Sequence, residues 1–256
     1  MAEKHNIVPV HSLGNKGGSN VIYYSIFLRE KEKEIIIGFS GTQGIIQLVT
    51  EVLEAFPVAY KLHDVKGGKV FDYFYAHYVN GFRDDVLNKT QEITQKYPSY
   101  KLVFVGHSLG GALTIHAAAD IILSGLANNT EVVIYTYGQP RVGDSKFNEA
   151  WMPKVTEFYR LVHNRDLVSH IPPCLRGLSA RCSKDGIFPF YPYHAAQEIF
   201  YDKEFQAHVY WSDTDGEDMQ CSNKIFKNSI DDHTHYFGIG VGQFHKNNEA
   251  ESIQNI

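Results

Sequence analysis

The chain has 256 residues, 43% of them hydrophobic, and a formal net charge of −5 at neutral pH. This length is enough for one large core, so we expect a single domain over residues 21–256, preceded by a loosely held lead-in at 1–20. The acidic balance and the lack of a basic stripe exclude a nucleic-acid-binding surface. No apolar run approaches the roughly 18 residues that cross a bilayer, so we expect no transmembrane segment.

Strands and helices alternate along the chain. The expected strands cover residues 21–28, 34–39, 102–105, 132–137, 157–162, 199–201 and 207–211. One long helix is expected from Asp72 to Tyr97, where Pro98 follows, and a second from Leu109 to Leu123. Strands separated by helices predict an α/β fold with a mostly parallel sheet.

An apolar strand runs directly into GHSLG at 106–110 and then into the second helix. In this context the motif exposes a nucleophilic serine, here Ser108, on a sharp turn. The two outer glycines stand where a side chain would collide with that turn. The helix points its N-terminus at Ser108, so the amide of Leu109 faces the position of an oxyanion. The alternative is a glycine-rich turn without a catalytic role.

A nucleophilic serine needs a base, and the base needs a carboxylate to orient it. Asp166 follows the expected strand 157–162, at the carboxyl end where open α/β sheets build their sites. The alternative is a surface acid paired with Arg165. On position alone, three other acids compete with it: Asp144, Asp202 and Asp232.

For the base, the stretch DDHTHYFG at 231–238 offers His233 and His235. With 13 histidines in the chain, chemistry alone leaves that choice open. Asp231 and Asp232 together with these histidines are also a conceivable metal site. They are crowded into adjacent positions without a second cluster, so we expect no metal and no other cofactor.

Six blocks of the sequence together resemble the class 3 (fungal filamentous type) triacylglycerol lipases, a family of α/β-hydrolases. They are FSGT at 39–42, NGF at 80–82, GHSLGGAL at 106–113, YGQPRVGD at 137–144, RDLVSHIPP at 165–173 and DHTHYFG at 232–238. The resemblance implies a mostly parallel central sheet with helices on both faces and a helical lid. It also implies that Ser108 is the nucleophile, Asp166 the acid and His233, rather than His235, the base.

The same resemblance assigns the oxyanion hole to the backbone amides of Thr42 and Leu109. Two donors that converge on one oxygen stabilise the charge that develops there, and losing one typically costs about 3 kcal/mol. The chain departs from the family pattern at Ser40, where an arginine is common.

After Thr42, residues 43–58 occupy the place of the lipase lid. On a helix, one face of this stretch is apolar, and the residues on that face are Ile45, Leu48, Val49, Val52 and Phe56. The general alternative is an ordinary surface helix packed on the core. As a lid, the segment would expose an apolar patch that a lipid surface buries, which predicts interfacial activation.

Localisation and disulfide pairing are less constrained. The chain as written starts without an apolar signal segment, and we expect a secreted or lumenal protein whose signal is not included, with the cytoplasm as the alternative. Sequons at Asn88 and Asn128 are compatible with secretion. Cys174 and Cys182 could close a loop inside an extra segment at 174–192, with Cys221 as the third cysteine.

These observations predict a serine carboxylic-ester hydrolase, acting as a lipase on acylglycerols at a lipid–water interface. A phospholipase A1 or a feruloyl-type esterase is the alternative on the same fold. The alternative from a different class is a catalytically silent lipase-like interaction protein, whose usual mark is a missing triad residue. Here all three triad positions are occupied by suitable residues.

Overall fold

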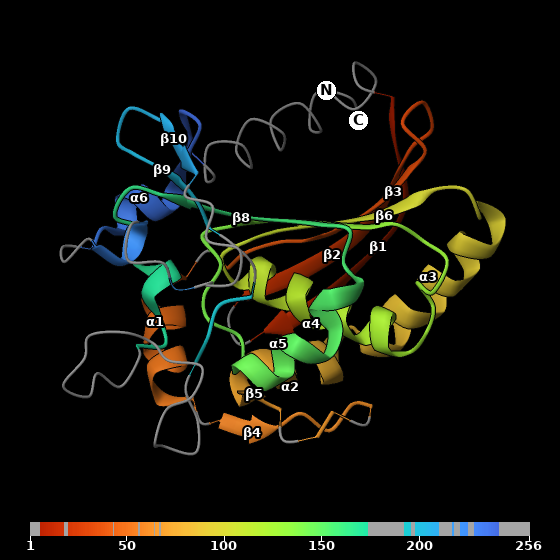
Figure 1. Cartoon of the computed structure of the whole chain (residues 1–256), viewed down its shortest axis with the longest axis horizontal. Helices are drawn as coiled ribbons and strands as arrows, with labels where there is room; N and C mark the ends of the chain where they lie inside the picture. Colours follow the sequence, from red (N-terminus) through yellow and green to blue (C-terminus); the bar gives the residue numbers. More distant parts are fainter. Residues whose placement is uncertain are drawn as a thin grey trace.

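An eight-stranded sheet runs through the computed structural model, which describes residues 6–17, 20–42, 44–55, 57–63, 65–66, 68–173, 192–195, 198–209, 217, 221–224 and 228–240 (Figure 1). In spatial order its strands are β1 (Ile7–Gly17), β2 (Asn20–Arg29), β3 (Glu34–Phe39), β6 (Lys101–His107), β7 (Val132–Tyr137), β8 (Glu157–His163), β9 (Glu198–Tyr201) and β10 (Ala207–Val209). Neighbouring strands from β3 to β9 are parallel, while β1, β2 and β10 join antiparallel. The expected mostly parallel central sheet is therefore confirmed.

Two small antiparallel pairs accompany the main sheet. They are β4 (Pro57–Ala59) with β5 (Lys69–Phe71), and β11 (His235–Tyr236) with β12 (Ile239–Gly240). The helices are α1 (Ile45–Glu54), α2 (Asp72–Gly81), α3 (Arg83–Lys96), α4 (Leu109–Leu123), α5 (Ser145–Trp151) and α6 (Ile230–Thr234). None of the helices described is long and apolar enough to cross a membrane.

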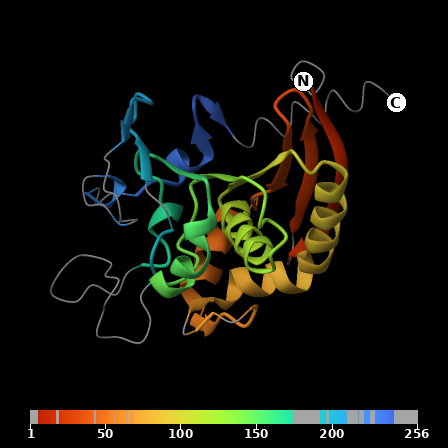
Figure 2. The same ribbon diagram turned by 45° about the vertical axis from the view of Figure 1, so that its right-hand side comes forward.

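Helix α4 is the centre of the packing. It lies against β3, β6 and β7, and α2, α3 and α5 pack around it on the same face of the sheet (Figures 1 and 2). We expected helices on both faces, and among the described residues α2 to α5 all lie on this one. Almost every residue of α4 is buried, which explains its apolar sequence and its small residues.

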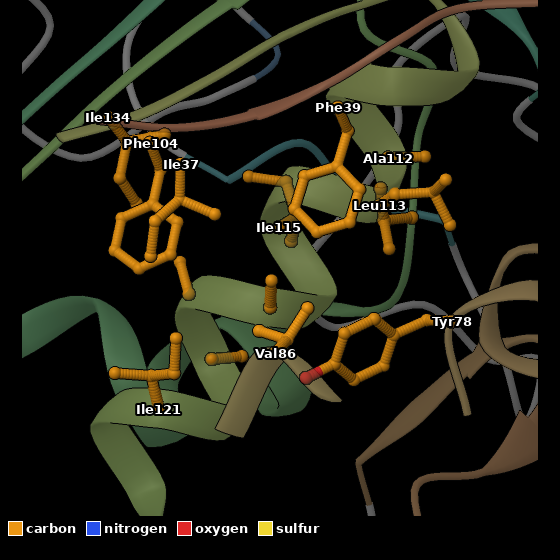
Figure 3. Packing of buried hydrophobic residues seen from close by; sticks show 14 of the residues in the cluster. Ile37, Phe39, Tyr78, Val86, Phe104, Ala112, Leu113, Ile115, Ile121 and Ile134 are labelled. Atoms are coloured by element: carbon orange, nitrogen blue, oxygen red, sulfur yellow. The ribbon is translucent and has the colours of Figure 1, made fainter. Parts of the chain in front are cut away.

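The core fills the space between the sheet and α4. Side chains of adjacent strands point into it, and Figure 3 shows them meeting the helices: Ile37, Phe104 and Ile134 from the sheet, Ile115 and Ile121 from α4, and Tyr78 and Val86 from α2 and α3. Ile37 and Phe104 are paired directly in neighbouring parallel strands, so their side chains point to the same face of the sheet.

Two expectations were wrong. Most of the predicted lead-in, residues 7–17, is the edge strand β1, which pairs with β2 from Ile7 to Gly17 with one register shift between Pro9 and His11. The strand was missed because polar residues stand on both of its faces, so it shows no alternation of apolar and polar residues. His11 bonds Asp85 and Leu13 packs on the core, whereas Ser12 bonds Ser25 on the other face.

The predicted single helix 72–97 is two helices. The chain breaks at Phe82, whose φ of −137° is not helical. Gly81 comes directly before the break, and a Cβ there would lie 2.3 Å from the side-chain nitrogen of Asn15. Gly81 therefore packs closely against the Asn15 side chain of β1 at the point where the helix turns.

Candidate active site

Ser108 lies on a strained turn between β6 and α4. Its φ of 58° and ψ of −127° are a conformation that residues with side chains rarely adopt. Its backbone N–H donates to the carbonyl of Tyr137 at 2.9 Å, which ties the turn to the end of β7. This geometry is the strand-to-helix elbow that the sequence predicts.

The glycines of the elbow are required by close backbone contacts. A Cβ on Gly106 would lie 2.3 Å from the carbonyl oxygen of Gly110. A Cβ on Gly110 would lie 2.3 Å from the carbonyl oxygen of Phe39. The start of α4 can therefore lie directly against the end of β3.

His233 and Asp166 form a buried hydrogen-bonded pair. Nδ1 of His233 lies 2.8 and 2.9 Å from the two carboxylate oxygens of Asp166, and both residues are fully buried. A carboxylate only accepts, so Nδ1 carries the proton and Nε2 has the free lone pair. The structure thus brings together two residues that are 67 positions apart in the chain.

The carboxylate of Asp166 is held in its charged form. Burial on its own raises its pKa, but the neighbouring His233 and the hydrogen bonds from His233 and Tyr236 together hold the pKa below its ordinary value. The backbone N–H of Val168 donates to Oδ1 at 2.8 Å, and the hydroxyl of Tyr236 donates to Oδ2 at 2.7 Å. The acid is therefore ionised and fixed in place from several sides.

The competing acids and the second histidine lie elsewhere. Asp144 caps α5 through the backbone N–H of Phe147, and Asp202 accepts bonds within its own turn. Asp232 binds Arg165 and the side chain of Asn164. His235, the other candidate for the base, is half-exposed, and its Nδ1 hydrogen-bonds to the backbone carbonyl of Asp231. Among the described residues, no three His, Cys, Asp or Glu side chains are grouped to hold a metal ion.

Sequence reasoning missed two residues that build the acid–base pair. Gly138, at the end of β7, has a φ of +55°, and a Cβ there would lie 2.5 Å from Asp166 Oδ2 and 2.7 Å from His233 Nδ1. Tyr236 holds the other side of the carboxylate. Both residues lie in sequence blocks that resemble the family, YGQPRVGD and DHTHYFG. Neither block indicates which side chain the glycine leaves room for.

Thr42 and Leu109, the expected oxyanion-hole residues, come directly after Gly41 and Ser108, which lie close together at the elbow. Gly41 brings the chain so close that a Cβ there would lie 3.5 Å from Cβ of Ser108, and Thr42 follows it directly. Leu109 is the first residue of α4, where a backbone N–H has no acceptor within the helix. Oγ1 of Thr42 accepts from the backbone N–H of Gly44 at 3.2 Å.

The stretch after Thr42 is helical where we expected a lid. Helix α1 covers residues 45–54 of the predicted 43–58, and the stretch then enters β4. Val52 is fully buried and Val49 half-buried, and both pack on the core. Ile45 and Leu48 belong to the helix, but their side chains lie outside what the structure describes, as does Phe56. Glu51 of α1 hydrogen-bonds to Tyr73 of α2.

The candidate reacting atoms are Oγ of Ser108 and Nε2 of His233. Within the described part of the chain, Oγ of Ser108 and Nε2 of His233 are both buried, and neither has a hydrogen-bond partner. In a buried site such atoms carry a desolvation cost unless a substrate or water meets them. A hydroxyl on a strained turn, an imidazole with a free Nε2 and an ionised carboxylate behind it are the components of nucleophilic acyl transfer.

Comparison with known proteins identifies the family. The family model described as lipase (class 3) matches residues 36–176, which is more than half of the chain. The chain belongs to the class 3 lipase family. The matched range begins in β3 and includes Ser108 and Asp166.

Two relatives match a larger part of the chain than the family model does. A lipase of Rhizomucor miehei is 32% identical over 216 residues, covering 83% of this chain and 54% of the relative. A lipase of Caenorhabditis elegans is 32% identical over 235 residues, covering 84% of this chain and 64% of the relative. The chain thus spans between half and two thirds of the length of these relatives.

Solved structures share the α/β-hydrolase fold. A triacylglycerol lipase matches with a TM-score of 0.76 at 28% identity, over 93% of this chain and 83% of that one. The predicted fold class and family are therefore confirmed. The predicted loop closed by Cys174 and Cys182 lies outside the described residues.

Proposed function

We propose that this class 3 lipase-family chain is a serine carboxylic-ester hydrolase that cleaves acylglycerols. The observation that carries the proposal is the buried Asp166–His233 pair beside a strained Ser108, with Oγ of Ser108 and Nε2 of His233 unengaged. The triacylglycerol lipase that shares this fold has a serine protease triad as its catalytic centre, which supports the same assignment here.

The proposed reaction has two steps. Oγ of Ser108 attacks the ester carbonyl while Nε2 of His233 takes its proton. The backbone amides of Thr42 and Leu109 hold the oxyanion, and the tetrahedral intermediate expels the alcohol, which receives the proton from His233. Water then attacks the acyl-enzyme in the same way and releases the acid. Asp166 keeps the imidazole in the required tautomer and stabilises its charged form.

We propose that α1 is a lid over this site. Val49 and Val52 are turned into the protein, while Thr50 is exposed, as expected of an amphipathic helix that covers a site in water. Opening it at a lipid surface would transfer the apolar face from the protein to the lipid. Substrates at a lipid–water interface are therefore favoured over dissolved esters.

The test is hydrolysis of p-nitrophenyl esters from butyrate to palmitate. The wild type should turn over the series, and Ser108→Ala should lose at least about a thousandfold in kcat. The matched control is Ser124→Ala, because Ser124 lies at the far end of the same helix and, among the described residues, its hydroxyl donates to the carbonyl of Ile121 alone. Ser124→Ala should keep full activity. An inert wild type contradicts the hydrolase and favours the interaction-protein alternative.

Substrate class needs a separate assay on three substrates. Emulsified trioctanoin, phosphatidylcholine vesicles and methyl ferulate separate a lipase from a phospholipase A1 and a feruloyl-type esterase. We expect the highest rate on trioctanoin, with a rise as the substrate exceeds its solubility. Val49→Ser should reduce that rise while sparing hydrolysis of dissolved p-nitrophenyl butyrate. Equal loss on both substrates contradicts the lid.

We also propose that the protein is secreted or lumenal. The support comes from the sequon Asn128–Thr130, whose asparagine is exposed in the turns between α4 and β7. Whether Asn128 accepts a glycan is tested by expressing the chain behind a secretory signal, as the wild type and as Asn128→Gln. We expect the wild type to carry extra mass that a glycosidase removes, and Asn128→Gln to lack it.

A further inference from the structure

His107, the residue before the nucleophile, lies against the proposed base. Its ring is stacked on the ring of His233, with centroids 4.6 Å apart and planes inclined by 27°. Its Nε2 lies 2.8 Å from the backbone carbonyl oxygen of His233. One side chain at the end of β6 therefore touches both the ring and the main chain of a residue 126 positions away.

The hydrogen bond fixes the tautomer of His107. A carbonyl oxygen can only accept, so Nε2 of His107 donates and carries its proton. In the neutral ring Nδ1 is then unprotonated. Gly41 lies beside this nitrogen, since a Cβ built on Gly41 would be 3.5 Å from it. Burial, followed by the proximity of His233, lowers the pKa of His107 to about 4. The ring is therefore neutral near pH 7.

A neutral ring at this position suits the chemistry. The titratable groups around His107 are His233, Asp166 and Tyr236, whose ring meets it edge-on with centroids 5.7 Å apart. During acylation His233 becomes an imidazolium, and a neutral aromatic face stabilises a neighbouring cation. A second cation there would oppose the proton transfer.

The contacts between His107 and His233 support a short helix that has little stability of its own. Helix α6, which carries His233, has only five residues, and its last residue is Thr234. Such a short helix does not fix its side chains by itself. The bond to His107 attaches the main chain of this helix to β6, the strand that leads directly into Ser108. The distance between base and nucleophile is thereby coupled to the central sheet.

We propose that His107 is a positioning residue, which holds the main chain of His233 through Nε2–H and supports its imidazole so that Nε2 of His233 reaches Ser108. This inference rests on the proposed ester hydrolysis and deepens it. The contacts of His107 described above are with His233 and Tyr236. His107 acts through His233, so its removal should lower turnover more than substrate binding.

Two substitutions separate the two contacts of His107. His107→Gln keeps an N–H donor at the same reach and loses the stacked ring, whereas His107→Phe keeps a ring and loses the donor. On p-nitrophenyl butyrate we expect kcat per active site to fall about tenfold in His107→Phe and about threefold in His107→Gln, with KM within twofold, because displaced groups lose rate steeply. Active sites are counted with a p-nitrophenyl phosphonate ester, which excludes misfolded molecules from the comparison.

The pH profile tests positioning against an electrostatic role. Neither substitution changes charge near pH 7, and His107→Phe also keeps an aromatic face beside His233, so in this variant the acid limb of kcat/KM should stay at the wild-type pH while the plateau falls. His116→Phe is the control, because His116 is also a buried imidazole with a lowered pKa but lies eight residues into α4, among aromatic rings. It should keep wild-type kcat.

Three results overturn the inference: His107→Phe within twofold of wild type per titrated site, His107→Gln no better than His107→Phe, or a displaced acid limb in His107→Phe. Failure of the proposed function looks different. In that case the wild type itself neither hydrolyses the ester nor reacts with the phosphonate.

Discussion

Gly138 leaves the space that Asp166 and its partner histidine occupy, because a Cβ at position 138 would lie 2.5 Å from Oδ2 of Asp166. The same glycine has a φ of +55°, which side chains disfavour. A contact this short cannot be accommodated without moving the carboxylate or the end of β7. The position of Asp166 and His233 therefore depends on the absence of a Cβ at residue 138, the residue that follows β7.

Replacing Gly138 by alanine should displace the pair. For Gly138→Ala we expect kcat/KM on p-nitrophenyl butyrate to fall at least about a hundredfold, since a displacement of about 1 Å in a site has that cost. Gly125→Ala is the control: Gly125 also has a positive φ, 83°, but lies in the turn after α4. It should lose stability and keep kcat. Similar kcat in both variants contradicts this role of Gly138.

Tyr236 holds Asp166 from the other side, and its removal should be visible in stability and in pH dependence. In Tyr236→Phe, Oδ2 loses a donor and the backbone N–H of His163 loses its contact with the hydroxyl. We expect the free energy of unfolding to fall by about 2 kcal/mol at pH 7, as is typical of a bond to a charged group. Urea titration measures it.

The sign of the pH effect follows from the lowered pKa of Asp166. A carboxylate with a folded-state pKa below its unfolded value, about 3.9, adds stability above that pH and loses it as the pH falls through the folded-state pKa. Loss of the Tyr236 bond raises the folded-state pKa, so the variant should lose this contribution at a higher pH. Tyr159→Phe is the control, because the Tyr159 hydroxyl bonds only Glu157 at the surface. A Tyr236→Phe variant with the acid midpoint of wild type contradicts the argument.

Local patterns in the sequence predict the strands and the elbow well. The strands β3 and β7 and the helix α4 have the expected bounds, because continuous apolar runs between turn residues leave little freedom. The edge strand β1 could not be predicted in this way, since only one of its faces packs and a bulge interrupts its register after Pro9. The break at Phe82 lies inside a stretch without proline, beside a contact between Gly81 and Asn15 of β1 that no local pattern contains.

The candidate site divides in the same way. The position of Ser108 follows from its own neighbours, whereas the choice of Asp166 over Asp232 depends on which loop ends face each other across the sheet edge. The sequence resemblance favoured Asp166 and His233, and the structure brings them into contact. Gly138 and His107 matter through what they touch far along the chain, so neither periodicity nor spacing indicates them.

His116 should make the protein sensitive to acid well above pH 4. It is completely buried between Tyr60 and Tyr78, and burial lowers its pKa to about 3. The unfolded chain binds its proton near pH 6.5, so stability is full above that pH and falls by up to about 1.4 kcal/mol per pH unit below it, until the folded-state pKa is reached. In His116→Phe, urea titrations from pH 7 to 4 should show a slope smaller by about one proton. An unchanged slope contradicts the buried neutral imidazole.

The hydrogen bond between Glu51 and Tyr73 should act as a latch for the proposed lid. It joins α1 to α2, and both burial and this bond raise the pKa of Tyr73. Tyr73→Phe removes the bond and leaves the ring in place. We expect faster hydrolysis of dissolved p-nitrophenyl butyrate, by about two- to fivefold for a bond worth about 0.5–1 kcal/mol, and a smaller rise at the interface of emulsified trioctanoin. Tyr159→Phe should leave both rates unchanged. If Tyr73→Phe also leaves both unchanged, the bond does not hold the helix closed.

The buried ion pair of Arg141 and Glu217 supports the loop that follows Asp166. Nε and Nη2 of Arg141 each lie 2.8 Å from a carboxylate oxygen of Glu217, and Nη1 donates to the carbonyls of His170 and Pro172. Burial alone would raise the pKa of Glu217, but the adjacent guanidinium holds it well below its ordinary value. Both side chains are almost completely buried, so removing one charge leaves the other without compensation.

Glu217→Gln should therefore destabilise the protein by about 3–5 kcal/mol, the usual cost of breaking a buried pair from one side. Because Arg141 also anchors the loop at 170–172, kcat should fall in the same variant even under conditions where it remains folded. Urea titration gives the first effect and activity per phosphonate-titrated site the second. The double variant Arg141→Met with Glu217→Leu removes both charges and should recover most of the stability. It should not recover kcat, because replacing Arg141 also removes the donor to the carbonyls of His170 and Pro172. Equal destabilisation of the single and double variants would show that packing, and not charge pairing, holds this loop.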